Sequence, residues 1–194
     1  MIAELEIDLG AIARNAARLA ALVAPAKLAP VVKANAYGHG LLPVALALAP
    51  RAAMLCVFAA CEALELRAAG IAHPVLVLGP VEHGELRALV REDVAIALWS
   101  EGAFPAELAR LGAAHGRPVT VHAKIETGVA RLGLAPERAP AALAAYRDEP
   151  RLALAGIYTH LAAAEELESE FTLEQLARFE RVLARAAGGA HARP

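Results

Sequence analysis

Residues 30–40 read PVVKANAYGHG, and this stretch decides between the candidate folds. The apolar run before Lys33 has the composition of a buried strand, so we predict a strand over residues 28–34 with Lys33 near its end. The glycines that follow do not form the GxGxxG pattern of a dinucleotide-binding loop, and the chain contains no Walker sequence. A doubly wound dinucleotide-binding sheet therefore has little support, and a barrel is favoured.

Short apolar runs alternate with segments of helical period along the rest of the chain. With the first run they predict six strands, over residues 28–34, 53–58, 74–78, 94–99, 118–125 and 152–159. Most runs are continuously apolar, as expected for parallel strands covered on both faces. The pattern indicates the α/β class and a TIM-type (β/α)8 barrel, but a closed barrel needs about eight units and about 250 residues. We therefore predict one incomplete barrel domain, of about six βα units, over residues 1–194.

Capping residues predict several helix boundaries. Asp8 is predicted to cap the first helix, and a helix over residues 62–69 is predicted to stop at Gly70. Ser100 is predicted to cap the next helix but one. Thr172 and Gln175 have the spacing of a capping box before a last helix that ends at residues 188–189.

Composition excludes several classes of protein. Apolar residues make up 58% and charged residues 21% of the chain, which is too apolar for a disordered protein. The net charge of -2 provides no basic field for nucleic acid or an anionic membrane. No apolar run approaches the length of a membrane span. We expect small-molecule partners, with no nucleic acid and no membrane.

The acidic N-terminus, together with the lack of a run long enough to span a membrane, predicts a cytoplasmic location by default. Glu4, Glu6 and Asp8 are unlike the basic start of a secretory leader. The two cysteines, Cys56 and Cys61, lie in apolar sequence without a zinc or CxxC spacing, so we interpret both as buried residues. The histidines show no HExxH or other ligand spacing, and no metal site is expected.

Lys33 has two interpretations by position alone. An amine directly after a buried apolar run can act as a nucleophile toward a carbonyl. A lysine at the end of a strand can equally extend its ammonium into water. Its neighbours decide between the two.

PVVKANAYGHG resembles the cofactor-lysine motif of the alanine racemases, the fold-type III pyridoxal-phosphate enzymes. Residues 121–133, VHAKIETGVARLG, and residues 156–165, GIYTHLAAAE, agree with that family in order and spacing. The EIDL at residues 6–9 also resembles the family's entry into its first helix. The resemblance covers nearly the whole chain.

The resemblance implies a role for five residues. Lys33 would bind pyridoxal 5'-phosphate covalently and act as one of two opposed bases, and Tyr37 would hydrogen-bond the phosphate. Arg131 would contact the cofactor's phenolic oxygen and the substrate carboxylate, to which a planar guanidinium is suited. Lys124 matches a lysine that is often carbamylated and that steadies this arginine. His160 would orient the second base.

The sequence departs from the family at three places. Glu126 stands where aspartate is usual, and Val129 where methionine is usual. The last residues, 191–194, stand where the family continues into further barrel strands and a β-rich C-terminal domain. That region holds a phosphate-binding serine, an arginine facing the pyridine nitrogen and the tyrosine that is the second base. We therefore expect a truncated chain that alone is impaired.

The resemblance implies an alanine racemase that supplies D-alanine for peptidoglycan and forms a homodimer. Three alternatives remain open at this point. One is a racemase of another amino acid. The second is a pyridoxal-phosphate carrier of similar barrel fold, and the third is a non-functional fragment.

Overall fold

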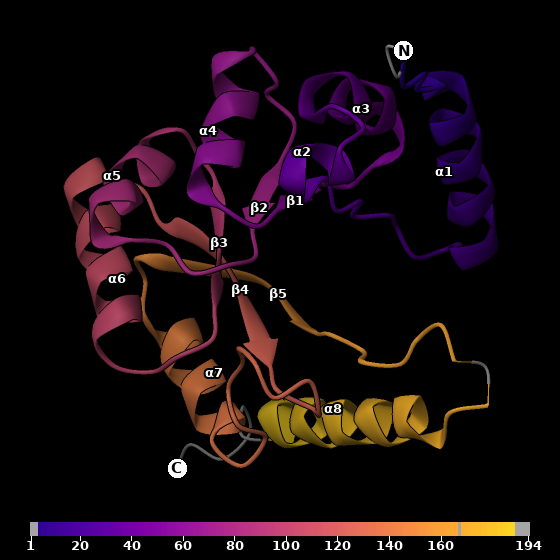
Figure 1. Cartoon of the computed structure of the whole chain (residues 1–194). Coiled ribbons are helices and arrows are strands. Elements are labelled where there is room, and N and C mark those ends of the chain that lie inside the picture. Colours follow the sequence, from indigo (N-terminus) through magenta and orange to yellow (C-terminus); the bar gives the residue numbers. More distant parts are fainter. Residues whose placement is uncertain (1–3, 167, 189–194) are drawn as a thin grey trace. The chain divides into compact units, whose positions relative to one another are not determined.

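The computed structural model describes residues 4–166 and 168–188, and the chain divides into two compact units, Met1–Ala95 and Ile96–Pro194. Each unit alternates strands and helices, and every strand pairing given below is parallel (Figure 1). The predicted α/β class is confirmed. Residue 189 of the last predicted helix and the stretch 191–194 lie outside the described residues.

The first unit contains two short strands whose residues are all buried. β1 pairs with β2, and Leu55 lies opposite Val75. Among the helices, α1 packs on α3, and α4 packs on both strands. The elements are α1 (Leu9–Val23), α2 (Lys33–Tyr37), α3 (Leu41–Leu48), the 3₁₀ turn η1 (Ala49–Arg51), β1 (Leu55–Val57), α4 (Ala60–Ala68), β2 (Val75–Val77) and α5 (His83–Arg91).

The strand predicted over residues 28–34 is wrong. Two isolated parallel bridges replace it, one from Leu28 to Ala52 and one from Val31 to Cys56. Pro30 has no N–H to donate, so the ladder cannot continue through it. After Val32 the backbone turns into α2, and Lys33 is the first residue of this helix rather than the end of a strand.

The second unit contains the longest strand pair. β3 (Ala95–Leu98) pairs with β4 (Val119–Ile125), which pairs with β5 (Leu152–Thr159) through a register shift after Val121. The helices are α6 (Ala103–His115), α7 (Ala139–Asp148) and α8 (Glu170–Gly188). Five of the six predicted strands are therefore present. The register places Lys124 beside Tyr158, and Ile125 beside Thr159.

Two predicted helix boundaries are confirmed. The Asp8 carboxylate accepts a hydrogen bond from the Ala11 N–H at 2.9 Å, as a cap should. α4 ends at Ala68, and Gly70 follows with a φ of +80°.

Two predicted caps are wrong. α6 begins after Gly102, two residues beyond Ser100, and the backbone carbonyl of Ser100 accepts a hydrogen bond from the Tyr146 hydroxyl at 2.6 Å. α8 begins at Glu170, so Thr172 and Gln175 lie inside the helix, and Gln175 is fully buried.

The cysteines fulfil the prediction only in part. Both are free thiols, and Cys56 is buried on β1, where burial raises its pKa to about 11. Cys61 is exposed, because α4 buries Ala60, Ala63 and Leu66, which are spaced three residues apart, and Cys61 lies off that face. Over residues 4–166 and 168–188, no helix is long and apolar enough to cross a membrane.

Candidate active site

Lys33 precedes a turn of four non-glycine residues in the left-handed conformation. Residues 34–37 have φ values from +52° to +55°. This conformation crowds Cβ against the carbonyl oxygen and costs roughly 1–2 kcal/mol per residue, so it persists only where contacts hold it. The Asn35 carboxamide oxygen accepts a bond from the Leu41 N–H at 2.7 Å, and the Asn35 carbonyl accepts one from the Gly40 N–H at 2.9 Å.

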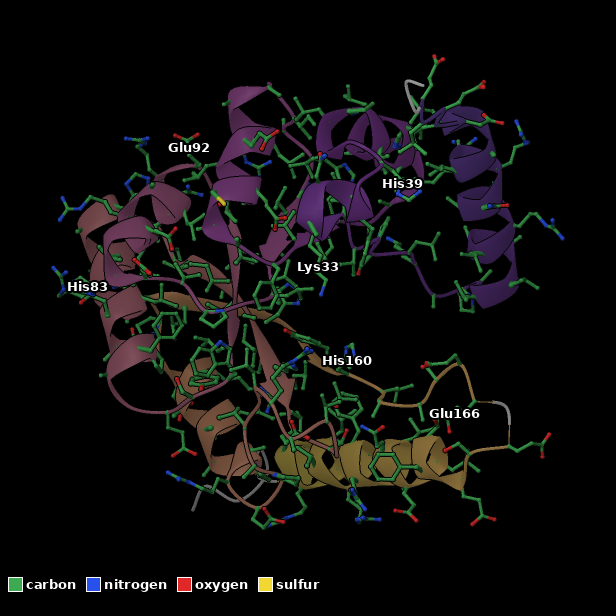
Figure 2. All side chains as sticks on the ribbon, viewed as in Figure 1. Lys33, His39, His83, Glu92, His160 and Glu166 are labelled. Carbon is green, nitrogen blue, oxygen red and sulfur yellow. The ribbon has the colours of Figure 1, made fainter. Side chains whose placement is uncertain are left out.

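The Lys33 amine, whose residue is labelled in Figure 2, lies close to two aromatic rings. Its Nζ is 5.4 Å from the centre of the Phe58 ring and 5.9 Å from that of Tyr37, and the residue is half-buried. In the part of the chain that the structure describes, no carboxylate pairs with this amine and no hydrogen bond engages it. The amine is therefore available to a ligand.

Glu62, on the first turn of α4, accepts three backbone hydrogen bonds beside Lys33. One carboxylate oxygen accepts from the Ala34 N–H at 2.5 Å. The other accepts from the Phe58 and Ala59 N–H groups at 2.9 and 3.0 Å. The carboxylate thus joins the left-handed turn to the segment that carries the Phe58 ring.

Lys124 is 5% exposed on β4. Burial, and secondly the positive charge of Arg131, lower the pKa of its amine, while Glu126 acts in the opposite direction. The two cations predicted to act together thus lie close enough to influence one another. A lowered pKa increases the neutral fraction of the amine, which is the form that reacts with electrophiles.

Arg131 is exposed on the loop after β4, and Glu126 holds that loop. The Glu126 carboxylate accepts the Gly128 N–H at 2.6 Å and the Arg131 N–H at 3.3 Å. Burial alone would raise the pKa of Glu126, but bonds from the backbone of residues 128–131 lower it below its ordinary value. The glutamate in place of aspartate therefore fixes the backbone of this loop.

His160 follows β5 directly, and its side chain is exposed (Figure 2). Its carbonyl accepts a bond from the Gln175 amide at 2.9 Å, and the same amide donates to the Thr127 hydroxyl at 3.0 Å. The side-chain oxygen of Gln175 accepts a hydrogen bond from the Ala162 N–H at 2.8 Å. Gln175 therefore joins the segments that follow β4 and β5.

The predicted site residues fall into two groups. Lys33 and Tyr37 come together in the first unit, and Lys124, Arg131 and His160 lie at or just beyond the carboxyl ends of β4 and β5 in the second. The sequence analysis missed Glu62, Phe58 and Gln175. Ala59 has no side-chain oxygen, so Ala59 and Glu62 do not form the sequence signature of a capping box, and the bond from Ala34 to Glu62 spans 28 positions.

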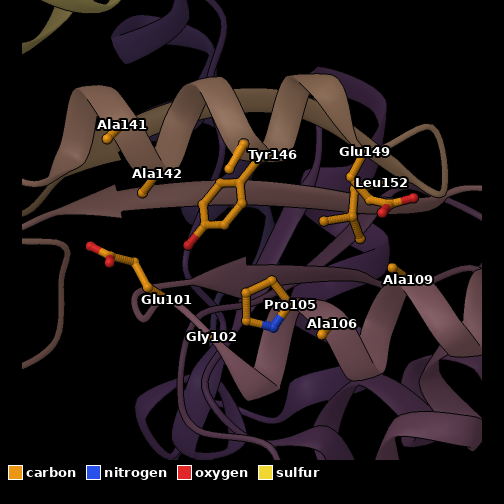
Figure 3. A pocket seen from close by; sticks show the side chains of 11 residues that line it. Glu101, Gly102, Pro105, Ala106, Ala109, Ala141, Ala142, Tyr146, Glu149 and Leu152 are labelled. Carbon is orange, nitrogen blue, oxygen red and sulfur yellow. The ribbon is translucent and has the colours of Figure 1, made fainter.

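A cavity of about 340 Å³ lies elsewhere, between α6 and α7 (Figure 3). Alanines and Pro105 line most of it, and Glu101 and Glu149 also face it. Its phenol, Tyr146, has a pKa raised to about 12 by burial and secondly by Glu101. None of the predicted site residues lines this cavity, so we do not assign the chemistry to it. No group of three metal-ligating side chains occurs among the described residues.

The fold and the site define a class of protein: a parallel α/β domain that gathers polar side chains after its strands, as (β/α)8 barrels do. The sequence profile described as "Alanine racemase, N-terminal domain" matches residues 7–193. The chain therefore belongs to the alanine racemase family, through that domain.

Relatives and solved structures agree with this membership. The chain is 44% identical over 179 residues to the alanine racemase of Xanthomonas oryzae pv. oryzae, covering 91% of this chain and 48% of that protein. It is 35% identical over 177 residues to the alanine racemase of Methanococcus maripaludis, covering 90% of this chain and 47% of that protein. The chain thus spans about half the length of the curated relatives it matches.

The structure of alanine racemase from D-cycloserine producing Streptomyces lavendulae is similar to this chain, with a TM-score of 0.86 and 34% identity over 94% of this chain and 48% of that one. The structure of alanine racemase from E. faecalis is also similar, with a TM-score of 0.85 and 33% identity over 92% of this chain and 49% of that one. Such neighbours are TIM-type barrels, of which this chain forms an incomplete portion, and the predicted fold is confirmed.

Proposed function

We propose that this chain is the cofactor-binding part of a pyridoxal-phosphate-dependent alanine racemase, with Lys33 as the lysine that carries the cofactor. The observation that carries the proposal is the Lys33 amine, which lies close to two rings on a half-buried residue and has no acidic partner among the described residues. Pyridoxal phosphate, when bound, supplies an aldehyde for amines and an electron sink that acidifies the α-hydrogen of an amino acid. A primary amine without an ion pair fits that group.

Lys33 and Tyr37 would hold the cofactor and serve the reaction. The Tyr37 side chain follows the lysine on the same turn and is 60% exposed, so its hydroxyl can donate to a phosphate oxygen. The Lys33 amine would take the α-hydrogen of one enantiomer as a proton and return it, as a general base and acid. The nearby Phe58 ring keeps water from one side of the amine.

Arg131 would bind the carboxylate of the amino acid and contact the cofactor's phenolic oxygen. Its guanidinium is exposed, while Glu126 holds its backbone in place. A planar guanidinium can form two parallel hydrogen bonds with a carboxylate. A carrier protein of similar fold has no need for such a group. His160, immediately after β5, would orient the second base.

Lys124 would be carbamylated. The neutral amine attacks the carbon of CO₂ and releases a proton to water, which leaves an anionic carbamate on Nζ. Burial and Arg131 lower the pKa of this amine and so favour the reactive form. The carbamate would then replace a repulsion between two cations by an attraction to Arg131.

We further propose a cytoplasmic homodimer that supplies D-alanine for peptidoglycan. The free thiols of Cys56 and Cys61 are compatible with a reducing compartment.

Exchange of the α-hydrogen of alanine in D₂O tests the proposal. With excess pyridoxal phosphate, the 194-residue chain should exchange the α-hydrogen of D-alanine faster than free cofactor does. Lys33→Ala should reduce exchange to the level of free cofactor, while the matched variant Lys27→Ala should retain it. Exchange that is unchanged in Lys33→Ala would refute the assignment, and faster exchange of serine than of alanine would favour a racemase of another amino acid.

A further inference from the structure

We propose that Glu62 is a positioning residue for Lys33, because its carboxylate fixes both the turn and the ring that set the direction of the amine. The inference rests on the proposed function in one respect, the identification of Lys33 as the reactive lysine. Glu62 itself does not touch the Lys33 amine in the contacts that the structure describes.

The carboxylate divides its two oxygens between two segments. Oε1 accepts from Ala34, which follows Lys33, and Oε2 accepts from Phe58 and Ala59, which follow β1. All three partners are donors, so both oxygens must be acceptors. An ionised carboxylate meets this demand, whereas a carboxamide presents a donor at one of the two corners.

The three bonds exceed what a helix cap requires. A glutamate three residues into a helix commonly accepts from the N-cap N–H, and the bond from Ala59 does this for α4. The bond from Ala34 serves a segment 28 positions away. Glu65, one turn further along α4, is exposed and provides a matched control.

The bond to Ala34 sets the direction of the lysine. The Ala34 N–H belongs to the peptide plane directly after Lys33, so fixing it fixes the rotation about the Lys33 Cα–C bond. The next four residues have positive φ values, from which non-glycine residues relax when they can. The Ala36 N–H also donates to the Val32 carbonyl at 2.9 Å, but that bond stays within the turn, whereas the bond from Ala34 ties the Lys33 side of the turn to α4.

The backbone of Phe58, which carries the ring, is held from two sides. The Phe58 backbone N–H donates to Glu62, and the Phe58 backbone carbonyl accepts the Gly79 N–H at 3.0 Å. A Cβ at position 79 would lie 2.5 Å from the Phe58 carbonyl oxygen and 2.9 Å from the ring, so only glycine allows this approach. Glu62 and Gly79 together thus place the ring beside the Lys33 amine.

The test measures how fast pyridoxal phosphate is captured at each lysine. Capture is stopped by borohydride at set times, and peptide mass spectrometry gives the ratio of label on Lys33 to label on the exposed Lys27. In Glu62→Gln this ratio should fall about ten- to a hundredfold, the order of loss that misplacement of a reacting group causes. Glu65→Gln should keep the ratio of the unsubstituted chain.

Glu62→Asp keeps the charge at the start of α4 but is one methylene shorter, so it cannot span both segments. It should lower the ratio as well, and it decides the question if Glu62→Gln does not fold. Unchanged ratios in the folded variants would overturn the role of Glu62 while leaving Lys33 as the reactive amine. No preference for Lys33 over Lys27 in the unsubstituted chain would instead refute the proposed function itself.

Discussion

Replacement of Gln175 by leucine tests whether one buried side chain holds the segments after β4 and β5 together. Its amide donates to the Thr127 hydroxyl and the His160 carbonyl, and its oxygen accepts the Ala162 N–H. The Thr159 hydroxyl donates to the Ile125 carbonyl at 2.9 Å, so the Thr127 hydroxyl must donate to Thr159. The Thr127 oxygen is therefore the acceptor for Gln175, and the chain of bonds runs in one direction.

The magnitude follows from the three bonds. Each contributes about 0.5–1.5 kcal/mol net, and partners left buried without a bond cost more. Leucine has nearly the volume of glutamine, so no large cavity forms. We expect Gln175→Leu to lower the free energy of unfolding by about 2–4 kcal/mol. Gln175→Glu should be at least as harmful, because an ionised carboxylate cannot donate to Thr127 or His160 and is costly to bury.

Urea unfolding, followed by circular dichroism, measures this loss. Leu173 lies on the same helix and is 66% exposed, so Leu173→Gln is the matched control and should change stability by less than about 0.5 kcal/mol. The m-value should remain the same in all variants. A loss below about 1 kcal/mol in Gln175→Leu would refute the reasoning, since it would mean that the three partners find other bonds at little cost.

Three further predictions concern the turn, the half-buried His122 and Lys124. Ala34→Gly should raise the free energy of unfolding by about 0.5–1 kcal/mol, since glycine avoids the left-handed penalty but loses more entropy; a lower stability would mean that the turn is not strained. Burial lowers the pKa of His122, so the unfolded chain binds the proton more readily, and stability should fall as pH drops below about 6.5. His122→Asn should show a weaker fall over the same window in thermal melts, and an equal fall would exclude His122 as its source. Carbamylation of Lys124 should increase with bicarbonate concentration and with pH, since it needs the neutral amine. ¹³C NMR with labelled bicarbonate measures it, and a carbamate signal that is absent at all pH values would contradict the assignment.

The sequence predicted most of the strands because their signal is local. β5 is a long apolar run and β4 has apolar residues at alternate positions, and the observed bounds of both strands lie within one residue of the predicted ones. The run at residues 28–34 has a similar composition but fails as a strand. Pro30 interrupts the ladder, and the turn after Lys33 is anchored by Glu62, which no local pattern reveals.

The candidate site was predictable to the extent that motifs carry it. Lys33 and Tyr37 share one motif, and Lys124 and Arg131 share another. Gln175 was misread because its spacing from Thr172 imitates a capping box, while its real partners lie 13 to 48 positions away. Long-range polar contacts of this kind depend on the packed fold and leave no periodic signal in the sequence.

The most direct test of the account is to find which lysine carries pyridoxal phosphate at saturation. The chain has three lysines, Lys27, Lys33 and Lys124, so reduction with borohydride and peptide mapping give an unambiguous answer. The account predicts one cofactor per chain on Lys33, and none in Lys33→Ala. Label that lies mainly on Lys27 or Lys124, or that persists undiminished in Lys33→Ala, would contradict it.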